Sequence, residues 1–359
     1  MHQYAFDTEL VRLAILLGVV VSMLFYDKYG VTTGGAIVPG YLALFVHRPT
    51  QIVATLLVAV VTYWIVQTQL RPRFMLWGRR LYEVEILVAL LLQSLWIGVL
   101  FLSTPLVPQL TLLYGIGFVL PGIMAHDMGR QGARTTIGAA VICALIVFGL
   151  VAITGAFRDI AGLPMSLANR VYHARGDQYA YPIEWLLLGV IVSVLMSMAL
   201  YRRVLSQSLF GQRPLTDSLR AGGFVTAGYL ALVINRPADL AFVLVCSAIT
   251  YLIVTQFLMR QAILFGRTKM AAMFIVGMMV TWFAEILLFA GGAAYVPWAG
   301  FHAISPTIVT LLANDAQRQG PSRTLVGVSV ATLGVLAVML LLGVTYGVFS
   351  GNQAIAWLR

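Results

Sequence analysis

Four groups of polar residues stand out from an otherwise apolar sequence, and each of them contains an arginine. They are His47-Arg48, His126-Asp127 with Arg130, Asn235-Arg236, and Asn314-Asp315 with Arg318. An arginine side chain binds a carboxylate or a phosphate through two parallel hydrogen bonds. The groups therefore indicate binding sites for an anionic substrate or polymer, in loops that follow four short apolar segments. The alternative is that these arginines only fix the topology or cap helix ends.

A carboxylate inside a membrane span is the next candidate. Glu285 lies near the middle of an apolar run, where a charged side chain costs about 2.5–3.5 kcal/mol on insertion, so we interpret it as a functional residue. A structural pair with a neighbouring span is the alternative. Glu83 stands at the start of another apolar run, where we expect it at the membrane interface beside Arg79 and Arg80.

Familiar catalytic and cofactor motifs are absent from the sequence. It contains no nucleophile elbow, phosphate-binding loop, paired catalytic carboxylates or dinucleotide motif. The pairs Gly34-Gly35 and Gly222-Gly223 lack the strand–loop–helix context of a phosphate cradle. Cys143 and Cys246 lie in apolar runs, where cysteine packs as a small residue, and no Cys/His spacing suggests a metal site. We therefore predict no catalytic residue, no metal and no cofactor.

The composition indicates an all-α polytopic membrane protein. Of the 359 residues, 60% are hydrophobic and 10% are charged, and the mean hydropathy is +0.91. No soluble fold needs that much apolar surface. We predict eight full spans, near residues 10–26, 51–70, 84–102, 135–153, 184–200, 240–258, 270–290 and 324–349. The first apolar run lacks a small-residue cleavage site, which argues against a cleaved signal peptide.

Four related short segments lie between these spans. The first, in residues 34–49, carries a Pro-Gly pair that removes a backbone donor and admits unusual dihedral angles. Residues 223–237 repeat its pattern without the proline, and the fourth copy has only the displaced Pro306. Freed backbone groups cannot face lipid, so we expect them to point toward a shared interior. The predicted helix breaks are Pro39, Gly40, Pro121, Gly122 and Gly228.

The chain is a tandem duplication. Gly35 and Gly223 are equivalent at a sequence offset of 188 (223 − 35 = 188), whereas Gly18 and Gly189 are equivalent at an offset of 171 (189 − 18 = 171). The second copy therefore carries a basic insertion, of length 188 − 171 = 17, near residues 201–220. The predicted domains are a first repeat at 1–155, a polar connector at 156–182, and a second, diverged repeat at 183–359.

Each half also repeats internally, because Pro39 and Pro121 are equivalent at an offset of 82 (121 − 39 = 82). If the short segments cross the membrane, the chain crosses twelve times and successive units are inverted. If they are re-entrant, it crosses eight times and the units are parallel. The positive-inside rule favours twelve crossings with both termini outside, because 16 of the 23 Lys and Arg then face the cytoplasm, against a split of 12 to 11. The 16 are Lys28, Arg71, Arg73, Arg79, Arg80, Arg130, Arg134, Arg202, Arg203, Arg213, Arg220, Arg260, Arg267, Lys269, Arg318 and Arg323. Six of them are candidates for docking a partner: Arg71, Arg73, Arg79, Arg80, Arg202 and Arg203.

The first half contains a series of motifs in a fixed order. They are Asp27-Lys28-Tyr-Gly-Val, Val38-Pro39-Gly40-Tyr-Leu-Ala-Leu, Gly78-Arg79-Arg80, and Gly115-Ile-Gly-Phe-Val-Leu-Pro121-Gly122-Ile ending in Arg130-Gln131-Gly132. This series resembles the PgsC/CapC family, the small membrane subunit of bacterial poly-γ-glutamate (capsule) synthesis. Residues 184–349 resemble a diverged second copy, which keeps Gly228-Tyr229-Leu-Ala-Leu and Arg318-Gln319-Gly320. The fusion of two copies departs from the usual single-copy pattern.

The resemblance implies an integral-membrane subunit of a poly-γ-glutamate synthesis and export complex in the bacterial inner membrane, not catalytic by itself. The implied partners are an ATP-dependent amide ligase, an extracytoplasmic accessory subunit, the anionic polymer and membrane lipids, without nucleic acid. Two other functions stay open. One is a stand-alone secondary transporter of a small anion, which the repeats suggest. The other is a membrane-embedded transferase with His126-Asp127 or Glu285 as acid or base.

Overall fold

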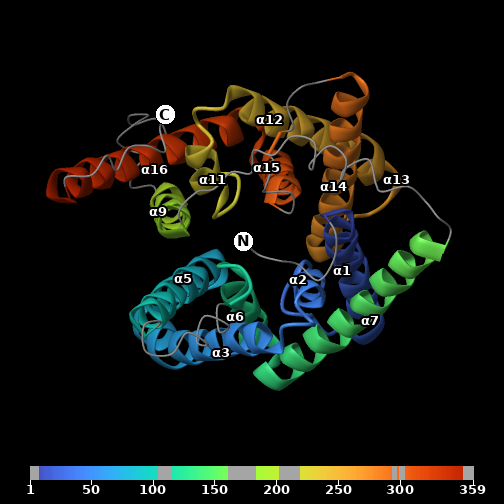
Figure 1. Ribbon diagram of the computed structural model, residues 1–359, viewed down its shortest axis with the longest axis horizontal. Helices are drawn as coiled ribbons and strands as arrows, with labels where there is room; N and C mark the ends of the chain where they lie inside the picture. The colour runs from blue at the N-terminus through green and yellow to red at the C-terminus, as the bar shows by residue number, and fades with distance from the viewer. Residues whose placement is uncertain are drawn as a thin grey trace. The chain divides into compact units, whose positions relative to one another are not determined.

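The computed structural model describes residues 8–103, 115–160, 183–201, 219–292, 297–298 and 304–350. Its contacts divide the chain into two units, Met1–Ala174 and Arg175–Arg359, which we call the first and the second unit. The described residues form helices and no strands (Figure 1). The protein is therefore an all-α polytopic membrane protein, as its composition predicts.

The two units contain equivalent series of helices. The first unit has α1 (Thr8–Tyr29), α2 (Val38–Leu44), α3 (Pro49–Ile65), the π-helix η1 (Val66–Leu70), α4 (Arg71–Phe74), α5 (Gly78–Ser103), α6 (Leu120–Gln131) and α7 (Ala133–Ile160). The second unit has α9 (Ile183–Tyr201), α11 (Thr226–Leu232), α12 (Pro237–Leu252), the π-helix η3 (Ile253–Leu258), α13 (Met259–Gln261), α14 (Gly266–Ala290), α15 (Ile304–Gln319) and α16 (Pro321–Ser350). The duplication thus extends to the π-helices.

The helices of the described residues fall into long and short classes. Seven stretches are long and apolar enough to cross a membrane: α1, α3 to α4, α5, α7, α12 to α13, α14 and α16. α9 adds a shorter apolar stretch, Trp185–Tyr201. α2 and α11 have seven residues each, which is about 10 Å of helix at 1.5 Å per residue. Neither of these two short helices spans a membrane alone.

Each short helix packs between two long ones. In the first unit, α2 lies against α1 and α7, and α6 lies against α3 and α5 (Figure 1). The second unit repeats this arrangement, with α11 against α9 and α16, and α15 against α12 and α14. We call a long helix, the short helix that follows it and the next long helix a triplet, so that α1–α2–α3 and α5–α6–α7 are the triplets of the first unit. Each short helix packs on the first helix of its own triplet and on the last helix of the other triplet of its unit. The two triplets of a unit are interleaved.

The first short segment runs back along the whole of α1. Its residues meet α1 in reverse order, beginning with Thr33, whose Oγ1 lies 2.5 Å from Ser22 Oγ. Gly40 then lies against the backbone of Ala14. The chain therefore travels from the C-terminal end of α1 toward its N-terminal end.

α6 takes the opposite direction. Ile116 N–H donates to Thr55 Oγ1 at 2.7 Å near the start of α3, and Gly129 lies beside Gln67 near its end. α6 is therefore parallel to α3, so the described residues of the first unit make six passes between its two ends. A re-entrant segment would return to the end it came from, whereas both short segments continue to the other end. This course agrees with the twelve-crossing topology.

The Pro-Gly pairs begin helices instead of interrupting them. Pro39 and Pro121 lie in the first turns of α2 and α6, where a missing backbone N–H costs no intrahelical hydrogen bond. The irregular backbone precedes them, at residues 31–37 and 115–119. The predicted breaks are thus displaced toward the N-terminus by a few residues.

The glycines of these segments serve close packing. A Cβ at Gly40 would lie 2.6 Å from Ala14 O, and one at Gly122 would lie 2.7 Å from Ile86 Cα. Gly228, which we predicted to be a helix break, lies inside α11. A Cβ there would lie 2.7 Å from Gly189 O. In each case a long helix approaches to within backbone contact. These residues hold the short helices to their neighbours.

Two of the sequence predictions fall outside the described residues. The connector at 156–182 is described only as far as residue 160, and residues 202–218 of the basic insertion lie outside as well. The docking candidates Arg202 and Arg203 belong to that part of the chain.

Candidate functional site

A glutamine clamps the start of the first short segment in both units. Gln131, at the end of α6, accepts from Thr32 N–H at 2.8 Å, and its amide donates to Thr32 O at 2.5 Å. The same amide donates to Thr136 Oγ1 at 2.9 Å. Two reciprocal hydrogen bonds fix the backbone where it leaves the end of α1 and turns back.

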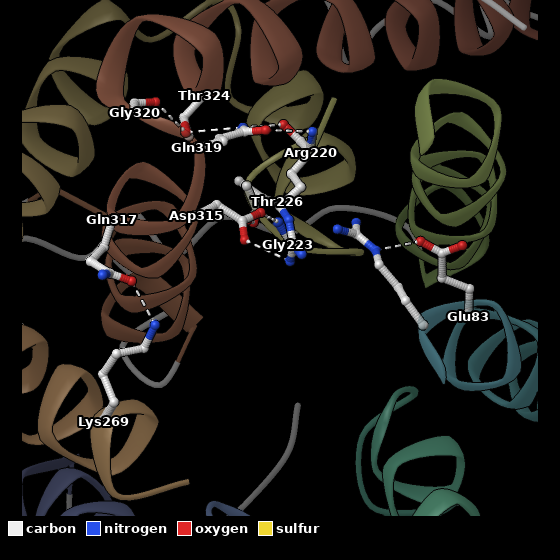
Figure 2. Close-up of polar contacts among 12 residues, drawn as sticks. Glu83, Arg220, Gly223, Thr226, Lys269, Asp315, Gln317, Gln319, Gly320 and Thr324 are labelled. Carbon is white, nitrogen blue, oxygen red and sulfur yellow. Dashed lines mark hydrogen bonds and ion pairs between the residues drawn. The ribbon is translucent and has the colours of Figure 1, made fainter. Parts of the chain in front are cut away.

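The second unit has the same clamp at the equivalent positions. Gln319 accepts from Arg220 N–H at 2.9 Å, donates to Arg220 O at 2.9 Å, and donates to Thr324 Oγ1 at 3.0 Å (Figure 2). The sequence offset is 188 at all three positions (220 − 32, 319 − 131 and 324 − 136). This agreement shows that the clamp belongs to the architecture of the unit.

The clamped segment continues into a pair of glycines with positive φ. The φ angles are 75° at Gly34 and 116° at Gly35, and 70° at Gly222 and 102° at Gly223. Side chains rarely adopt these angles, which explains the glycines. Ile123 lies against Gly35 and Leu311 lies against Gly223, so the pairs also admit the neighbouring short helix. They are structural turns, as the missing phosphate-cradle context predicts.

A buried acid–histidine pair lies between α5 and α6. Glu85 Oε2 is 2.6 Å from His126 Nδ1, and the exposed fractions of the two side chains are 0% and 25%. Tyr82 packs edge-on against the imidazole, with 4.7 Å between the ring centroids. The carboxyl group fixes the orientation of the ring and holds Nδ1 in a hydrogen bond. This leaves Nε2 as the nitrogen available to a ligand or a proton.

The pair is extended by a chain of hydrogen bonds from the π-helix. Gln67 Nε2 donates to Glu85 Oε1 at 3.2 Å, and Arg71 Nη1 donates to Gln67 Oε1 at 2.7 Å. Arg71 Cζ also lies 5.0 Å from the centre of the Trp77 ring. π-helical turns are rare and occur often at functional sites. We call Glu85, His126, Gln67 and Arg71 the first-unit polar site.

The second unit has different side chains at the same location. Met273 replaces Glu85 and Asn314 replaces His126, since both pairs share the offset of 188 (273 − 85 and 314 − 126). Lys269 supplies a cation there: its ammonium donates to Gln317 Oε1 at 2.6 Å, and the residue is 7% exposed (Figure 2). A buried glutamate in the first unit is thus absent from the second, where a buried lysine lies nearby.

Asp315 connects the region around Lys269 to the backbone segment that Gln319 holds at Arg220. Its Oδ2 accepts from Gly223 N–H at 3.1 Å and its Oδ1 lies 3.8 Å from Arg220 Nη1. Figure 2 shows Asp315 turned toward Gly223 and Arg220, while Lys269 reaches Gln317 of the same helix. Asp127, its equivalent in the first unit, is likewise buried, at 4% exposed. The predicted candidates Asp127 and Asp315 therefore face the interior of their units.

The structure places the predicted polar groups in helices. His126, Asp127 and Arg130 lie in α6, and Asp315 and Arg318 lie in α15, not in loops. Both helices continue to Gly132 and Gly320, whose φ angles are 91° and 90°. The polar residues form the last turns of these helices because the glycines, not the polar side chains, terminate them.

The predicted arginines do not gather at one site within a unit. Arg48 is the N-cap residue of α3, whereas Arg130 follows Gly129, which lies beside Gln67. Arg48 and Gln67 lie at opposite ends of the helix formed by α3 and η1. They are about 28 Å apart, since roughly 19 residues rise 1.5 Å each. Arg236 is the N-cap residue of α12 at the corresponding end of the second unit. Arg48 and Arg236 are therefore separated from the polar sites.

The remaining acidic candidates have structural neighbours. Glu285 lies in α14, half-buried, and acts electrostatically on Cys246 of α12. Glu83 pairs with Arg79 at 2.8 Å, as expected, and is 1% exposed because it packs between helices. In the part of the chain that the structure describes, no three His, Cys, Asp or Glu side chains gather as a metal site requires.

Sequence reasoning missed the residues that complete both polar sites. Glu85, Gln67, Lys269 and Gln317 received no functional role, although Glu85 and Lys269 are charged residues at the edges of apolar runs. A comparison of the two halves of the sequence could have identified these residues. At the offset of 188, Glu85 corresponds to Met273 and Lys269 corresponds to Leu81, so the halves differ in charge where their scaffold agrees.

The architecture of both units agrees with one known family. A family model described as capsule biosynthesis CapC matches residues 17–137 and 209–325. The chain belongs to the CapC family. Each match lies within one unit: the first runs from within α1 to the start of α7, and the second runs from residue 209, beyond α9, to the start of α16. The chain is thus a tandem duplication of the CapC unit.

Two curated relatives carry the same family name. The "PGA biosynthesis protein CapC" of Bacillus subtilis (strain 168) is 34% identical over 139 residues, which are 38% of this chain and 91% of the relative. The "Capsule biosynthesis protein CapC" of Bacillus anthracis is 30% identical over 139 residues, with the same coverage. Each relative therefore corresponds in length to one unit, whereas the CapC chain described here contains two. No solved structure matches it.

Proposed function

We propose that this CapC chain is the integral-membrane subunit of a complex that synthesises and exports an anionic polymer of the poly-γ-glutamate type in the bacterial inner membrane. A separate ATP-dependent amide ligase forms the polymer bonds, and an extracytoplasmic subunit completes the complex. The observation that carries the proposal is the CapC match in both units, because each unit keeps the family scaffold.

The charged turn between α3 and α5 supports docking of a partner at one end of the first unit. Arg73 and Arg80 are exposed there. Phe74, Met75 and Trp77 in the same turn are 67%, 79% and 69% exposed. Aromatic and arginine side chains that are left open together are typical of protein interfaces. Arg79 is held in its ion pair with Glu83 and is less available than Arg73 and Arg80.

The proposal is tested by deleting the gene in its host and measuring extracellular γ-linked glutamate after acid hydrolysis. Deletion abolishes the polymer, and the wild-type chain restores it. A variant with Arg73→Glu and Arg80→Glu retains its level in the membrane but no longer retains the ligase on affinity purification. The matched control is Arg260→Gln, an exposed arginine in the second unit. Normal polymer yield in the deletion strain contradicts the proposal.

A second candidate is a stand-alone secondary transporter of a small anion. The interleaved, oppositely directed triplets of each unit favour it, because inverted repeats with interrupted helices are common in such transporters. Reconstitution separates the two functions. Purified chain in proteoliposomes that takes up labelled glutamate without any partner is a transporter, whereas a complex subunit gives no uptake above empty vesicles.

A further inference from the structure

The second-unit location between α14 and α15 holds more positive than negative charge. The buried ammonium of Lys269 has a neutral amide oxygen as its hydrogen-bond acceptor. Arg318 and Arg220 act on it electrostatically, and so does one acidic residue, Asp315. The four groups sum to a net charge of +2 (three cations and one carboxylate). The C-terminal end of α15 offsets only about half a charge.

Asp315 does not neutralise Lys269 by direct contact. Its carboxylate is occupied by the Gly223 N–H at 3.1 Å and by Arg220 at 3.8 Å, while Lys269 bonds to Gln317. Gln319 fixes the backbone of Arg220 at both N–H and C=O. Lys269 therefore has no carboxylate in direct contact with its ammonium among the described residues. A buried cation is costly unless an anion compensates it.

A second, independent observation comes from Asn314. This residue is 7% exposed, and its Oδ1 has no hydrogen-bond partner among the described residues. Asn314 and Gln317 are three residues apart in α15 and share one face of the helix. The unpaired acceptor thus lies on the face that carries the Lys269 contact. A buried polar atom without a partner costs about 1–3 kcal/mol, which a ligand donor would recover.

We propose that Lys269, Gln317 and Asn314, with Arg220 and Arg318 beside them, form an anion site that binds a carboxylate with an amide next to it. The carboxylate accepts from the Lys269 ammonium, and the amide N–H donates to Asn314 Oδ1. Each residue of a γ-linked glutamate chain carries a free α-carboxylate and an amide N–H on the same carbon. This choice of ligand rests on the proposed function, whereas the need for an anion rests on the charges alone.

The first unit cannot form the same site. Leu81 stands in place of Lys269, Gly129 in place of Gln317, and Thr32 in place of Arg220. His126 occupies the position of Asn314, and its Nδ1 is already bonded to Glu85. Anion binding is therefore assigned to the second unit, and the two halves of the duplication have taken different chemical roles.

The test uses the full-length chain purified in detergent at fixed ionic strength. The probes are short oligomers of γ-linked glutamate and, separately, inorganic phosphate. The readouts are the shift in unfolding temperature and the Kd from titration. The oligomers stabilise the wild type, and Lys269→Met weakens their binding about ten- to hundredfold, the range expected for lost hydrogen bonds to a charged group. Arg260→Gln, an exposed arginine bonded to Gln256, leaves the Kd unchanged.

Ligand-free stability gives an additional check on the same variant. Removing an uncompensated buried charge leaves the unfolding temperature of Lys269→Met equal to or above that of the wild type. A fall in that temperature shows that Lys269 is already satisfied and overturns the proposal. Arg318→Gln changes an exposed side chain and serves if Lys269→Met does not fold.

Three results overturn the proposal directly. They are an unchanged Kd in Lys269→Met, an unchanged Kd in Arg318→Gln, and stabilisation by phosphate with none by the glutamate oligomers. Because these measurements use the purified chain, their failure is distinct from a normal polymer yield in the deletion strain, which would contradict the proposed function instead.

Discussion

Glu85 and His126 depend on each other because the fully buried Glu85 carboxylate is bonded to the partly buried imidazole of His126 between α5 and α6. Deleting the acid alone leaves His126 Nδ1 and Gln67 Nε2 without their acceptor. The second unit shows that the same scaffold accepts Met273 and Asn314 at these positions. The fold itself therefore does not require the pair.

We expect Glu85→Met to lower the free energy of unfolding by about 1–3 kcal/mol, since it strands two partly buried polar groups. The double variant Glu85→Met with His126→Asn, which copies the second unit, recovers at least about 1 kcal/mol of that loss through coupling. Thermal or denaturant unfolding of the purified chain measures both. Strict additivity of the two substitutions would show that the residues do not interact.

The hydrogen bonds of the glutamine clamp should also contribute to the free energy of unfolding. Gln131→Ala removes three hydrogen bonds, and we expect a loss of about 1–3 kcal/mol in unfolding free energy. Hydrogen exchange of the Thr32 amide accelerates in this variant. Gln319→Ala gives the same effect at Arg220, and Gln261→Ala, which changes an exposed glutamine, serves as the control. Unchanged protection at Thr32 would contradict the assigned role.

Short helices are held by backbone-to-backbone contacts at glycine. A Cβ at Gly40 meets the carbonyl oxygen of Ala14 at 2.6 Å, and backbone cannot rotate away as a side chain can. Gly138 in α7 has open space around it and an ordinary helical conformation. Similar substitutions at these two glycines therefore have opposite consequences.

We expect Gly40→Ala to separate α2 from α1 and to destabilise the first unit by about 1–3 kcal/mol, the usual cost of overpacking. Gly138→Ala stabilises by up to about 1 kcal/mol through helix propensity. Unfolding temperatures of the two purified variants give the comparison. Equal temperatures would mean that the α1–α2 contact yields without cost.

Much of the element-level architecture is predictable from sequence, and the polar sites are not. Long apolar runs indicate the spans, and the constant offset between the halves indicates the duplication. The predicted loops were wrong at His126 and Asp315, because polar residues at a membrane boundary resemble a loop until the terminating glycine is considered. Glu85–His126 and Lys269–Gln317 join residues 41 and 48 positions apart in sequence. No local spacing reveals such pairs.

At the scale of the molecule, the direction of the short segments determines the topology. The first short segment ends at the turn that holds His47, and Arg130 lies in the last turn of α6 at the opposite end of the unit. Both residues are exposed. The chain's two cysteines, Cys143 and Cys246, are buried, so they interfere little with accessibility labelling.

Single cysteines introduced as His47→Cys and Arg130→Cys should react with a membrane-impermeant maleimide from opposite sides of intact cells and inverted vesicles. Asn235→Cys and Arg318→Cys repeat the test in the second unit. The Arg130 and Arg318 positions label from the cytoplasmic side, following the positive-inside rule. Labelling of both members of a pair from one side excludes the twelve-crossing topology.

Interleaved packing also dictates the order in which a unit can be completed at the ribosome. α2 is made together with α1, but its other neighbour, α7, begins only at Ala133, after α3, α5 and α6 have been made. The translocon cannot insert a helix of seven residues as an independent span, and the bare backbone before it cannot face lipid. α2 must therefore wait until α7 emerges before it settles. A nascent chain arrested before α7 exposes an unfinished segment, which membrane proteases and insertion chaperones can recognise.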